Sequence, residues 1–243
     1  MIRNLFIIAV AALVLSIACL MGAAAIGGHE FRRGGWSIPG DAWTWVSSDD
    51  IDWSSESVSE RALDWTGGEA LEVRLPARVI YAQAEETSVT VSGDPDYVER
   101  VRFEDGRFTL DRRDGEAVRG GRLRITVTAP AVTRFEMHGS HRLEIRDYDQ
   151  DTLTVRLNGS GDVEAYGRAR TLDLEIHGSG DAEMDGLSVQ DARIAVHGSG
   201  SAEIAATGQV DAAVHGSGDI ELKVRPAQLN SQVHGSGRVR QDD

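Results

Sequence analysis

The sequence predicts an all-β protein whose main part is a parallel β-helix, a solenoid with rungs of about 19 residues. A tripeptide of His or Asn followed by Gly-Ser recurs in the C-terminal half, at spacings of 20, 19, 20, 18 and 19 residues. A near-constant period in this range indicates one solenoid turn per repeat. Apolar and polar residues alternate on both sides of the tripeptide, which is typical of strands with one buried face. The copies begin at His138, Asn158, His177, His197, His215 and His234.

The acidic composition disfavours polyanionic binding partners. The chain has 243 residues, of which 26% are charged, and its formal net charge is −14. Binding to nucleic acid or to an anionic membrane surface through a basic patch is not expected, because phosphate contacts need clustered Lys and Arg. The only cysteine, Cys19, lies in an apolar N-terminal segment, so the rest of the chain has neither an internal disulfide nor a cysteine-ligated metal.

Residues 1–26 have the pattern of an export signal. Arg3 precedes an uncharged apolar run that starts at Leu5 and ends near Ile26. A run of alanines at 23–25 offers a cleavage site, which favours a secretory signal peptide. The run is also long enough for an uncleaved membrane anchor, and lipidation of Cys19 is a third alternative. Each alternative places the remaining chain in the periplasm or cell envelope, with membrane contact only through this segment.

Residues 27–66 form a lead-in rich in Trp, Ser and Asp. All five tryptophans lie in this segment and none lies in the repeats. One interpretation is a flexible spacer, because its Ser- and Asp-rich part has little apolar content. Another is an N-terminal cap in which Trp43 and Trp45 cover the first rung, since terminal repeats need capping. A carbohydrate-binding aromatic platform is the third.

Residues 67–130 are expected to form irregular first coils of the same solenoid, in one domain that extends over 67–243. Turn signals at Gly93-Asp94-Pro95 and at Asp105-Gly106 separate short apolar segments, and no segment shows a sustained helical period. The expected strands span 71–75, 79–82, 88–91, 98–103, 107–110 and 123–127.

Residues 131–243 contain the regular repeats. The residues one, three and five positions before each His or Asn are mostly apolar, as Leu157, Val155 and Leu153 are, and mostly apolar positions follow again past the turn. The tripeptide is therefore interpreted as a structural corner, in which Gly supplies conformations that other residues avoid. The serine is expected to form a hydrogen bond with the corner of the neighbouring rung.

Two outward rows of carboxylates follow from the same register. The first contains Glu144, Glu164, Glu183, Glu203 and Glu221, and the second contains Asp162, Asp181 and Asp219. Like charges one rung apart repel by roughly 1 to 3 kcal/mol, so these residues are either solvated or hold cations. Weak Ca²⁺ binding is the alternative to solvation, and its candidate ligands are Asp162, Asp181, Glu164 and Glu183.

The histidines are expected to stack in one column that only Asn158 interrupts. A structural corner is the first interpretation. A soft dication such as Zn²⁺ bridging neighbours is the second, with His177, His197 and His215 as candidate ligands. The column is also expected to be pH-sensitive, because protonation would place like charges one rung apart.

The corners with the sequence Gly-Ser-Gly-Asp at 159–162, 178–181 and 216–219 carry a resemblance, together with the strand at 125–130 that leads into 135–140. These segments resemble the putative auto-transporter adhesin, head GIN domain family of bacterial exported proteins. The resemblance covers about residues 70–240. It implies an exported β-helical domain and supplies no catalytic residues.

The leading functional hypothesis is a non-enzymatic, adhesin-like interaction module of the envelope, with a protein or a glycan as partner. One alternative is a self-associating rod that stacks end to end through its last rung, where Arg238 and Arg240 stand in place of acidic residues. The other is a carbohydrate-active enzyme that uses outward carboxylates as acid and base. The uniformly short rungs disfavour the enzyme, because an active site normally interrupts the pattern. No catalytic or cofactor-binding residue is predicted.

Overall fold

The computed structural model describes residues 58–65, 67–111 and 123–242, all of which belong to the compact unit Trp53–Asp243. The predicted export segment, Trp43 and Trp45 lie outside the described residues. Within the described ranges, no helix is both long enough and apolar enough to cross a membrane.

The described residues form one continuous 16-stranded sheet and one short helix. The all-β class is confirmed. The elements are β1 (Ser59–Leu63), β2 (Ala70–Val73), β3 (Arg78–Gln83), β4 (Ser88–Gly93), α2 (Pro95–Val98), β5 (Val101–Glu104), β6 (Arg107–Leu110), β7 (Leu123–Ala129), β8 (Arg134–Gly139), β9 (Arg142–Gly159), β10 (Asp162–Gly178), β11 (Asp181–Gly198), β12 (Ser201–Ala206), β13 (Gln209–Gly216), β14 (Asp219–Leu222), β15 (Gln228–Gly235) and β16 (Arg238–Gln241).

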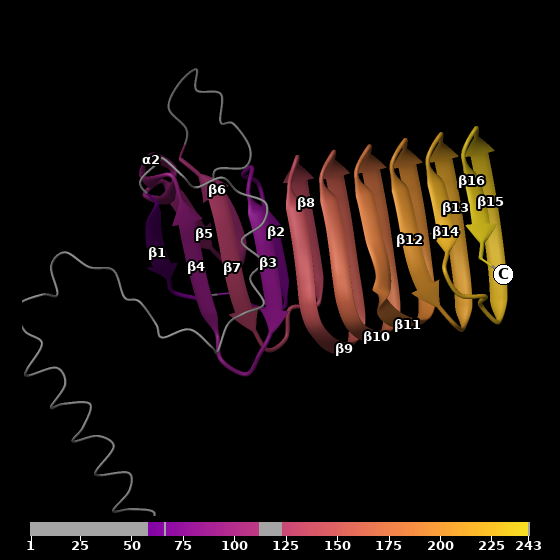
Figure 1. The fold of residues 1–243 in the computed structure, drawn as a ribbon, viewed down its shortest axis with the longest axis horizontal. Coiled ribbons are helices and arrows are strands. Elements are labelled where there is room, and N and C mark those ends of the chain that lie inside the picture. The colour runs from indigo at the N-terminus through magenta and orange to yellow at the C-terminus, as the bar shows by residue number, and fades with distance from the viewer. Residues whose placement is uncertain (1–57, 66, 112–122, 243) are drawn as a thin grey trace, which may run out of the picture. The chain divides into compact units, whose positions relative to one another are not determined.

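From β8 onward the chain is a parallel β-solenoid of about five turns, as predicted. Figure 1 shows its strands side by side from β8 to β15 and β16. All strand pairs of this part are parallel, and residues at equal repeat positions are partners, as His177 and His197 are. The repeat spacing read from the sequence is therefore the length of one rung.

In the rungs formed by β9, β10 and β11, the second corner differs from the expected turn between two separate strands, whereas β12 and β13, like β14 and β15, are separate strands. β9, β10 and β11 are single strands of 18, 17 and 18 residues that bend around this corner. The register shifts between Ala165 and Gly167 and again between Met184 and Ser188, which marks β-bulges. An extra residue in a strand bends it without ending its hydrogen-bonded ladder, so the corner of these three strands requires no turn.

The Gly-Ser corner is a structural element, as expected. Gly198 has φ +138°, and a Cβ built on it would lie 2.1 Å from the carbonyl oxygen of Gly178 in the preceding rung. The main-chain N–H of Ser199 donates a hydrogen bond of 2.9 Å to that same oxygen. The hydrogen bond expected from the serine is thus made by its main chain, and glycine is required because the rungs approach too closely for a side chain.

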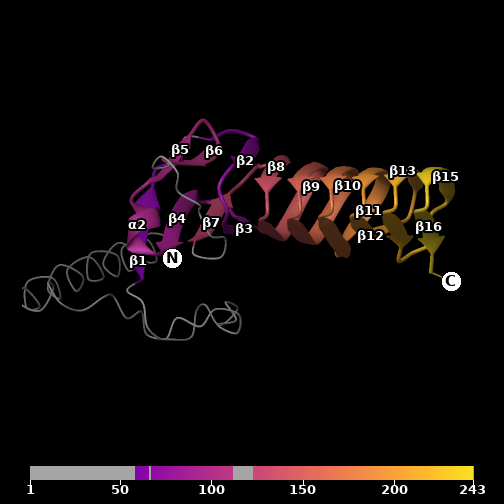
Figure 2. The same ribbon diagram turned by 90° about the horizontal axis from the view of Figure 1, so that it is seen from above.

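The N-terminal part continues the sheet but includes antiparallel strands. β3 pairs in parallel with β7 and β9, and β2 pairs in parallel with β6 and β8. In contrast, β4 is antiparallel to β7, β1 to β4, and β5 to β6. Figure 2 shows these strands at the opposite end of the solenoid from β15 and β16. This end therefore combines parallel pairs with antiparallel ones, which the expectation of solenoid coils did not include.

The prediction of a strand at 98–103 is wrong about where the strand begins. Pro95–Val98 is a single helical turn, and β5 begins at Val101. The Asp94 side chain caps this turn by accepting a hydrogen bond of 3.0 Å from the Asp96 N–H. Asp before Pro is a strong start signal, because proline lacks the N–H that a first helical position leaves unpaired. Only a turn was predicted at Gly93-Asp94-Pro95.

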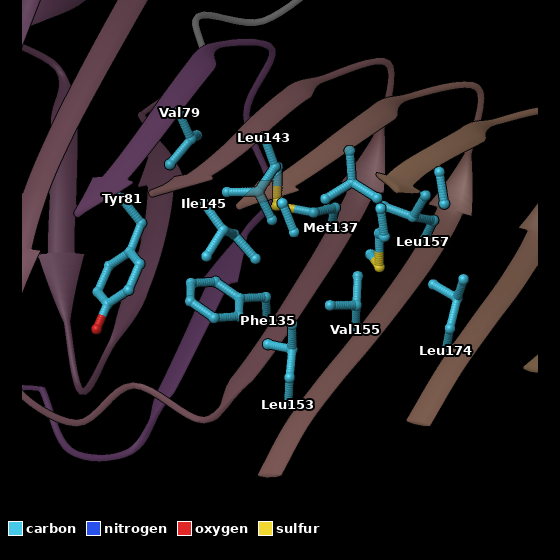
Figure 3. Close-up of a cluster of buried hydrophobic side chains, with 14 of the residues drawn as sticks. Val79, Tyr81, Phe135, Met137, Leu143, Ile145, Leu153, Val155, Leu157 and Leu174 are labelled. Atoms are coloured by element: carbon cyan, nitrogen blue, oxygen red, sulfur yellow. The ribbon is translucent and has the colours of Figure 1, made fainter. Parts of the chain in front are cut away.

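The solenoid interior is filled by the residues predicted to point inward. Figure 3 shows part of this core, in which Tyr81 and Phe135 lie beside the aliphatic side chains of the first rungs. Their rings meet edge to face with centroids 5.0 Å apart. The Tyr81 hydroxyl donates a hydrogen bond of 2.8 Å to the Ala129 carbonyl, which satisfies its polar atom inside the core. One inward position forms a continuous column of buried side chains in successive rungs, namely Leu153, Leu172, Ala192 and Val210.

His141 is a buried exception in the first corner. It occupies the position where the other five corners carry a second glycine, and only 6% of it is exposed. Its Nε2–H donates to the His138 carbonyl, whereas its Nδ1 is buried without a hydrogen-bond partner. Burial lowers the pKa of His141, because a proton on Nδ1 would be neither solvated nor paired.

We expect the free energy of unfolding to fall as the pH is lowered below about 6.5, where unfolded His141 takes up a proton that the folded protein resists. Between the folded and unfolded pKa values the unfolded state binds more protons, so acid favours unfolding. Urea unfolding at pH 7.5 and 5.5 measures the change. His141→Gly, which restores the residue of the other corners, is expected to reduce the pH dependence. An unaltered dependence in this variant would contradict the assignment.

Candidate functional site

One outward face of the solenoid carries the histidine column. We call it the histidine face and define it by the six column positions and the residues two places before each. The rings of His177, His197, His215 and His234 are stacked, with centroids 4.7, 5.0 and 4.9 Å apart and interplanar angles of 7°, 2° and 8°. The residues two places before the column are Glu136, Arg156, Glu175, Ala195, Ala213 and Gln232.

The carboxylate of Glu175 lies beside the imidazoles of His177 and His197. His177 Nε2 donates a hydrogen bond of 2.7 Å to Glu175 Oε1. A ligand atom of His197 completes a group in which all three atoms lie within 4.8 Å of one another. The other oxygen of Glu175 accepts from Arg156 Nε at 3.2 Å. The hydrogen bond from His177, acting against burial, lowers the pKa of Glu175.

A second group of three lies at the start of the column. Glu136 Oε1 is 2.8 Å from His138 Nε2, and Glu72 Oε1 is 3.6 Å from the same nitrogen. Glu72 is also paired with Arg74 and Arg107. This group therefore contains one imidazole, and one of its carboxylates already binds two guanidinium groups.

The glutamate row lies in register as predicted, from Glu144 to Glu221. Basic side chains of the protein lie beside both ends of this glutamate row. Lys223 Nζ lies 2.9 Å from Glu203 and 2.8 Å from Glu221, and Arg240 reaches the other oxygen of Glu221 at 3.1 Å. At the other end, Arg78 lies 3.6 Å from Glu144. Repulsion along the row is therefore offset by the protein's own Lys and Arg, which the spacing alone does not reveal.

The four carboxylates proposed for Ca²⁺ lie in two adjacent rungs. Arg142 approaches Asp162 at 3.5 Å and Glu164 at 3.9 Å. Asp181 accepts hydrogen bonds of 2.9 and 2.6 Å from the main-chain N–H and the hydroxyl of Ser201. Among the described residues, neither these carboxylates nor His215 belongs to a group of three converging ligand atoms.

A polar hollow follows the second corner across four successive rungs. We call it the corner groove. It has a volume of about 770 Å³. A second hollow, of about 370 Å³, is lined by the next residues along the same strands. The larger hollow is lined by Asp149, Gln150, Asp151, Arg168, Ala169, Arg170, Ser188, Val189, Gln190 and Thr207.

Ion pairs link neighbouring rungs in the corner groove. Arg168 donates two hydrogen bonds, of 2.5 and 2.7 Å, to the carboxylate of Asp149. Arg170 Nε lies 3.5 Å from Asp151. The hydrogen bond from Arg168 lowers the pKa of Asp149. The groove thus presents fixed guanidinium and carboxylate groups beside amides and hydroxyls.

The repeated corners and the register of the strands agree with a family model, described as "Putative auto-transporter adhesin, head GIN domain", that matches residues 69–226. The chain belongs to this family. The GIN domain defined by the match includes the whole corner groove, both three-residue groups and every rung up to β14.

A solved structure has the same fold as this GIN domain. It is a putative adhesin from Bacteroides fragilis, 20% identical, with a TM-score of 0.62 over 77% of this chain and 98% of the other. A second similar structure is a putative adhesin from Parabacteroides distasonis, 19% identical, with a TM-score of 0.48 over 77% of this chain and 98% of the other. A search of the curated proteins finds no significant relative.

The sequence analysis missed three acidic residues of the two possible metal-binding groups, namely Glu72, Glu136 and Glu175. A signal for two of them exists: a Glu two positions before a His in a strand lies on the same face as that His. Glu72 carries no such signal, because it reaches His138 from β2, which is distant from β8 in the sequence.

Proposed function

We propose that the protein is an exported, non-enzymatic, adhesin-like module that binds a glycan of the cell envelope through the corner groove. Family membership supports the adhesin-like role. The single observation that carries the choice of ligand is the polar lining of the groove over four rungs.

The lining favours a polyhydroxylated ligand over a protein surface. Carboxylates, guanidinium groups and amides can each donate to or accept from sugar hydroxyls. Protein interfaces usually centre on buried aromatic and other apolar anchors. The residues that line the larger hollow include no aromatic side chain, and Ala169 and Val189 are its only apolar members.

The same charges support binding without hydrolysis. Glycoside hydrolysis needs one carboxyl group kept protonated by its surroundings while another is ionised. In the groove, Asp149 and Asp151 each face an arginine, and the pKa of Asp149 is lowered. Asp149 therefore lacks the environment of a general acid, whose pKa has to be raised.

A glycan array probed with the full chain tests the ligand class. We expect binding to envelope glycans and a loss of at least roughly tenfold in affinity on replacing Arg168 and Arg170 together by alanine, because alanine removes the guanidinium donors to the sugar hydroxyls. Arg142→Ala, on a different face, is the matched control and should bind as the natural chain does.

Several outcomes would contradict this proposal. They are the absence of any glycan signal, an equal loss in the Arg142→Ala control, and release of shortened sugars during incubation. Light scattering that shows concentration-dependent growth, without glycan binding, would favour the self-associating rod. Fractionation of the producing cells tests export, and recovery of the chain in the cytoplasm would contradict it.

A further inference from the structure

We propose that Glu175, His177 and His197 bind a divalent transition metal ion, with Zn²⁺ as the ion that best fits these ligands. The inference goes beyond glycan binding and concerns a different face of the solenoid. It begins from the observation that ligand atoms of the three side chains already lie within 4.8 Å of one another.

The chemistry of the group selects the metal. Two imidazoles and one carboxylate form a typical ligand set for Zn²⁺, with metal–ligand distances of about 2.0 to 2.2 Å and a fourth position open to water. Ca²⁺ and Mg²⁺ prefer oxygen ligands only, so two imidazoles disfavour them. The carboxylate of Glu175 also supplies a negative charge that imidazole ligands alone do not provide.

The geometry requires one modest rearrangement. A tetrahedral ion needs its ligand atoms about 3.3 Å apart. Glu175 Oε1 and His177 Nε2 are already 2.7 Å apart. The His177 and His197 rings are nearly parallel with centroids 4.7 Å apart, so they must tilt toward each other at their nitrogen edges. Among the described residues, the His197 ring makes no hydrogen bond, so the tilt changes only its stacking on His177 and His215.

The neighbours of the group leave room for the ion. Ala195 is the partner of Glu175 in the next rung, and its side chain ends at Cβ. Arg156 binds only the second oxygen of Glu175, which leaves Oε1 directed at His177. The exposed position of His177 gives an ion and its water direct access from solvent.

The sequence brings these ligands together at one rung only. Glu136 also precedes a histidine by two positions, but the next member of the column is Asn158. The pairs that His215 forms with His197 and His234 lack a carboxylate, because the positions two places before these three histidines hold Ala213, Ala195 and Gln232. Glu175 is thus the only acidic residue of the histidine face beside two consecutive histidines, among the described residues.

Titration of the full chain, purified without a polyhistidine tag, against a chromophoric chelator of micromolar Zn²⁺ affinity tests the site. We expect one Zn²⁺ per chain. His197→Asn and Glu175→Gln should each weaken binding by roughly tenfold or more. Asn at 197 is compatible with the fold, because Asn158 occupies the same column. His234→Asn, two rungs beyond His197, is the matched control and should change the affinity less than about twofold.

X-ray absorption spectroscopy of the Zn²⁺ complex provides a structural readout. We expect nitrogen and oxygen ligands at about 2.0 to 2.1 Å with scattering from two imidazoles. The proposal is overturned if the chain does not compete with the chelator, or if the control weakens binding as much as His197→Asn does. Unchanged affinity in Glu175→Gln would also overturn it. Circular dichroism melting of each variant separates a loss of ligand from a loss of fold.

Discussion

Replacing Gly198 with alanine is expected to lower the free energy of unfolding by about 3 to 4 kcal/mol. The φ of +138° is strained for any side chain, and the new Cβ would lie 2.1 Å from the Gly178 carbonyl oxygen. Relief of that clash moves the rungs apart and breaks the hydrogen bond from Ser199 N–H to the same oxygen. Urea unfolding followed by circular dichroism measures the loss.

Gly68→Ala is the matched control. A Cβ added to Gly68 would have no heavy atom within 4 Å, and the φ of this glycine lies outside the strained positive range. Its substitution should change stability by less than about 0.5 kcal/mol. A similar loss in both variants, or no loss in Gly198→Ala, would show that the close approach of the corner glycines does not limit the rung spacing.

Leu172→Ala should cost about 3 kcal/mol, since a buried Leu→Ala change loses transfer energy and leaves a cavity. Leu172 is 2% exposed and lies between Leu153 and Ala192 in the inward column. A rung held between two neighbours cannot collapse easily around the void. The midpoint of urea unfolding should fall while its slope stays constant.

Leu229→Ala makes the same substitution in the same column of the last described rung. Leu229 is only partly buried, and β15 pairs with β13 alone among the described strands. The expected cost is about 1 kcal/mol. Equal losses at both positions would contradict the picture of stability built from contacts between neighbouring rungs. They would also indicate that β15 is covered in solution, as the self-associating rod requires.

The period of the sequence was sufficient to predict the rungs. Equal spacing of His177 and His197 places them in adjacent rungs, and strand alternation then decides that Leu174 and Ile176 point inward. The same alternation puts Glu175 on the histidine face. The predicted Ca²⁺ ligands, however, rest on register alone, and register does not show that Arg142 approaches Asp162 and Glu164.

The N-terminal part was predicted less well because it lacks a repeat. The strands at 79–82 and 107–110 were located from apolar content, but their directions could not be derived from it. Pairing of β4 with β7 is antiparallel, whereas pairing of β3 with β7 is parallel. Local composition fixes which residues are extended, and strand direction depends on how connecting segments reach the sheet.

The sequence by itself determined the length of a rung, the inward and outward columns, and the need for glycine at the Gly-Ser corner. These properties depend on period and alternation, which are local. Only the tertiary structure decided that β9, β10 and β11 pass the second corner through a bulge. It also decided that Lys223 lies between two glutamates and that ligand atoms of Glu175 and His197 lie close together across rungs. The reason is physical: register aligns backbones, whereas the contact between two side chains depends on rotamers and on the size of their neighbours.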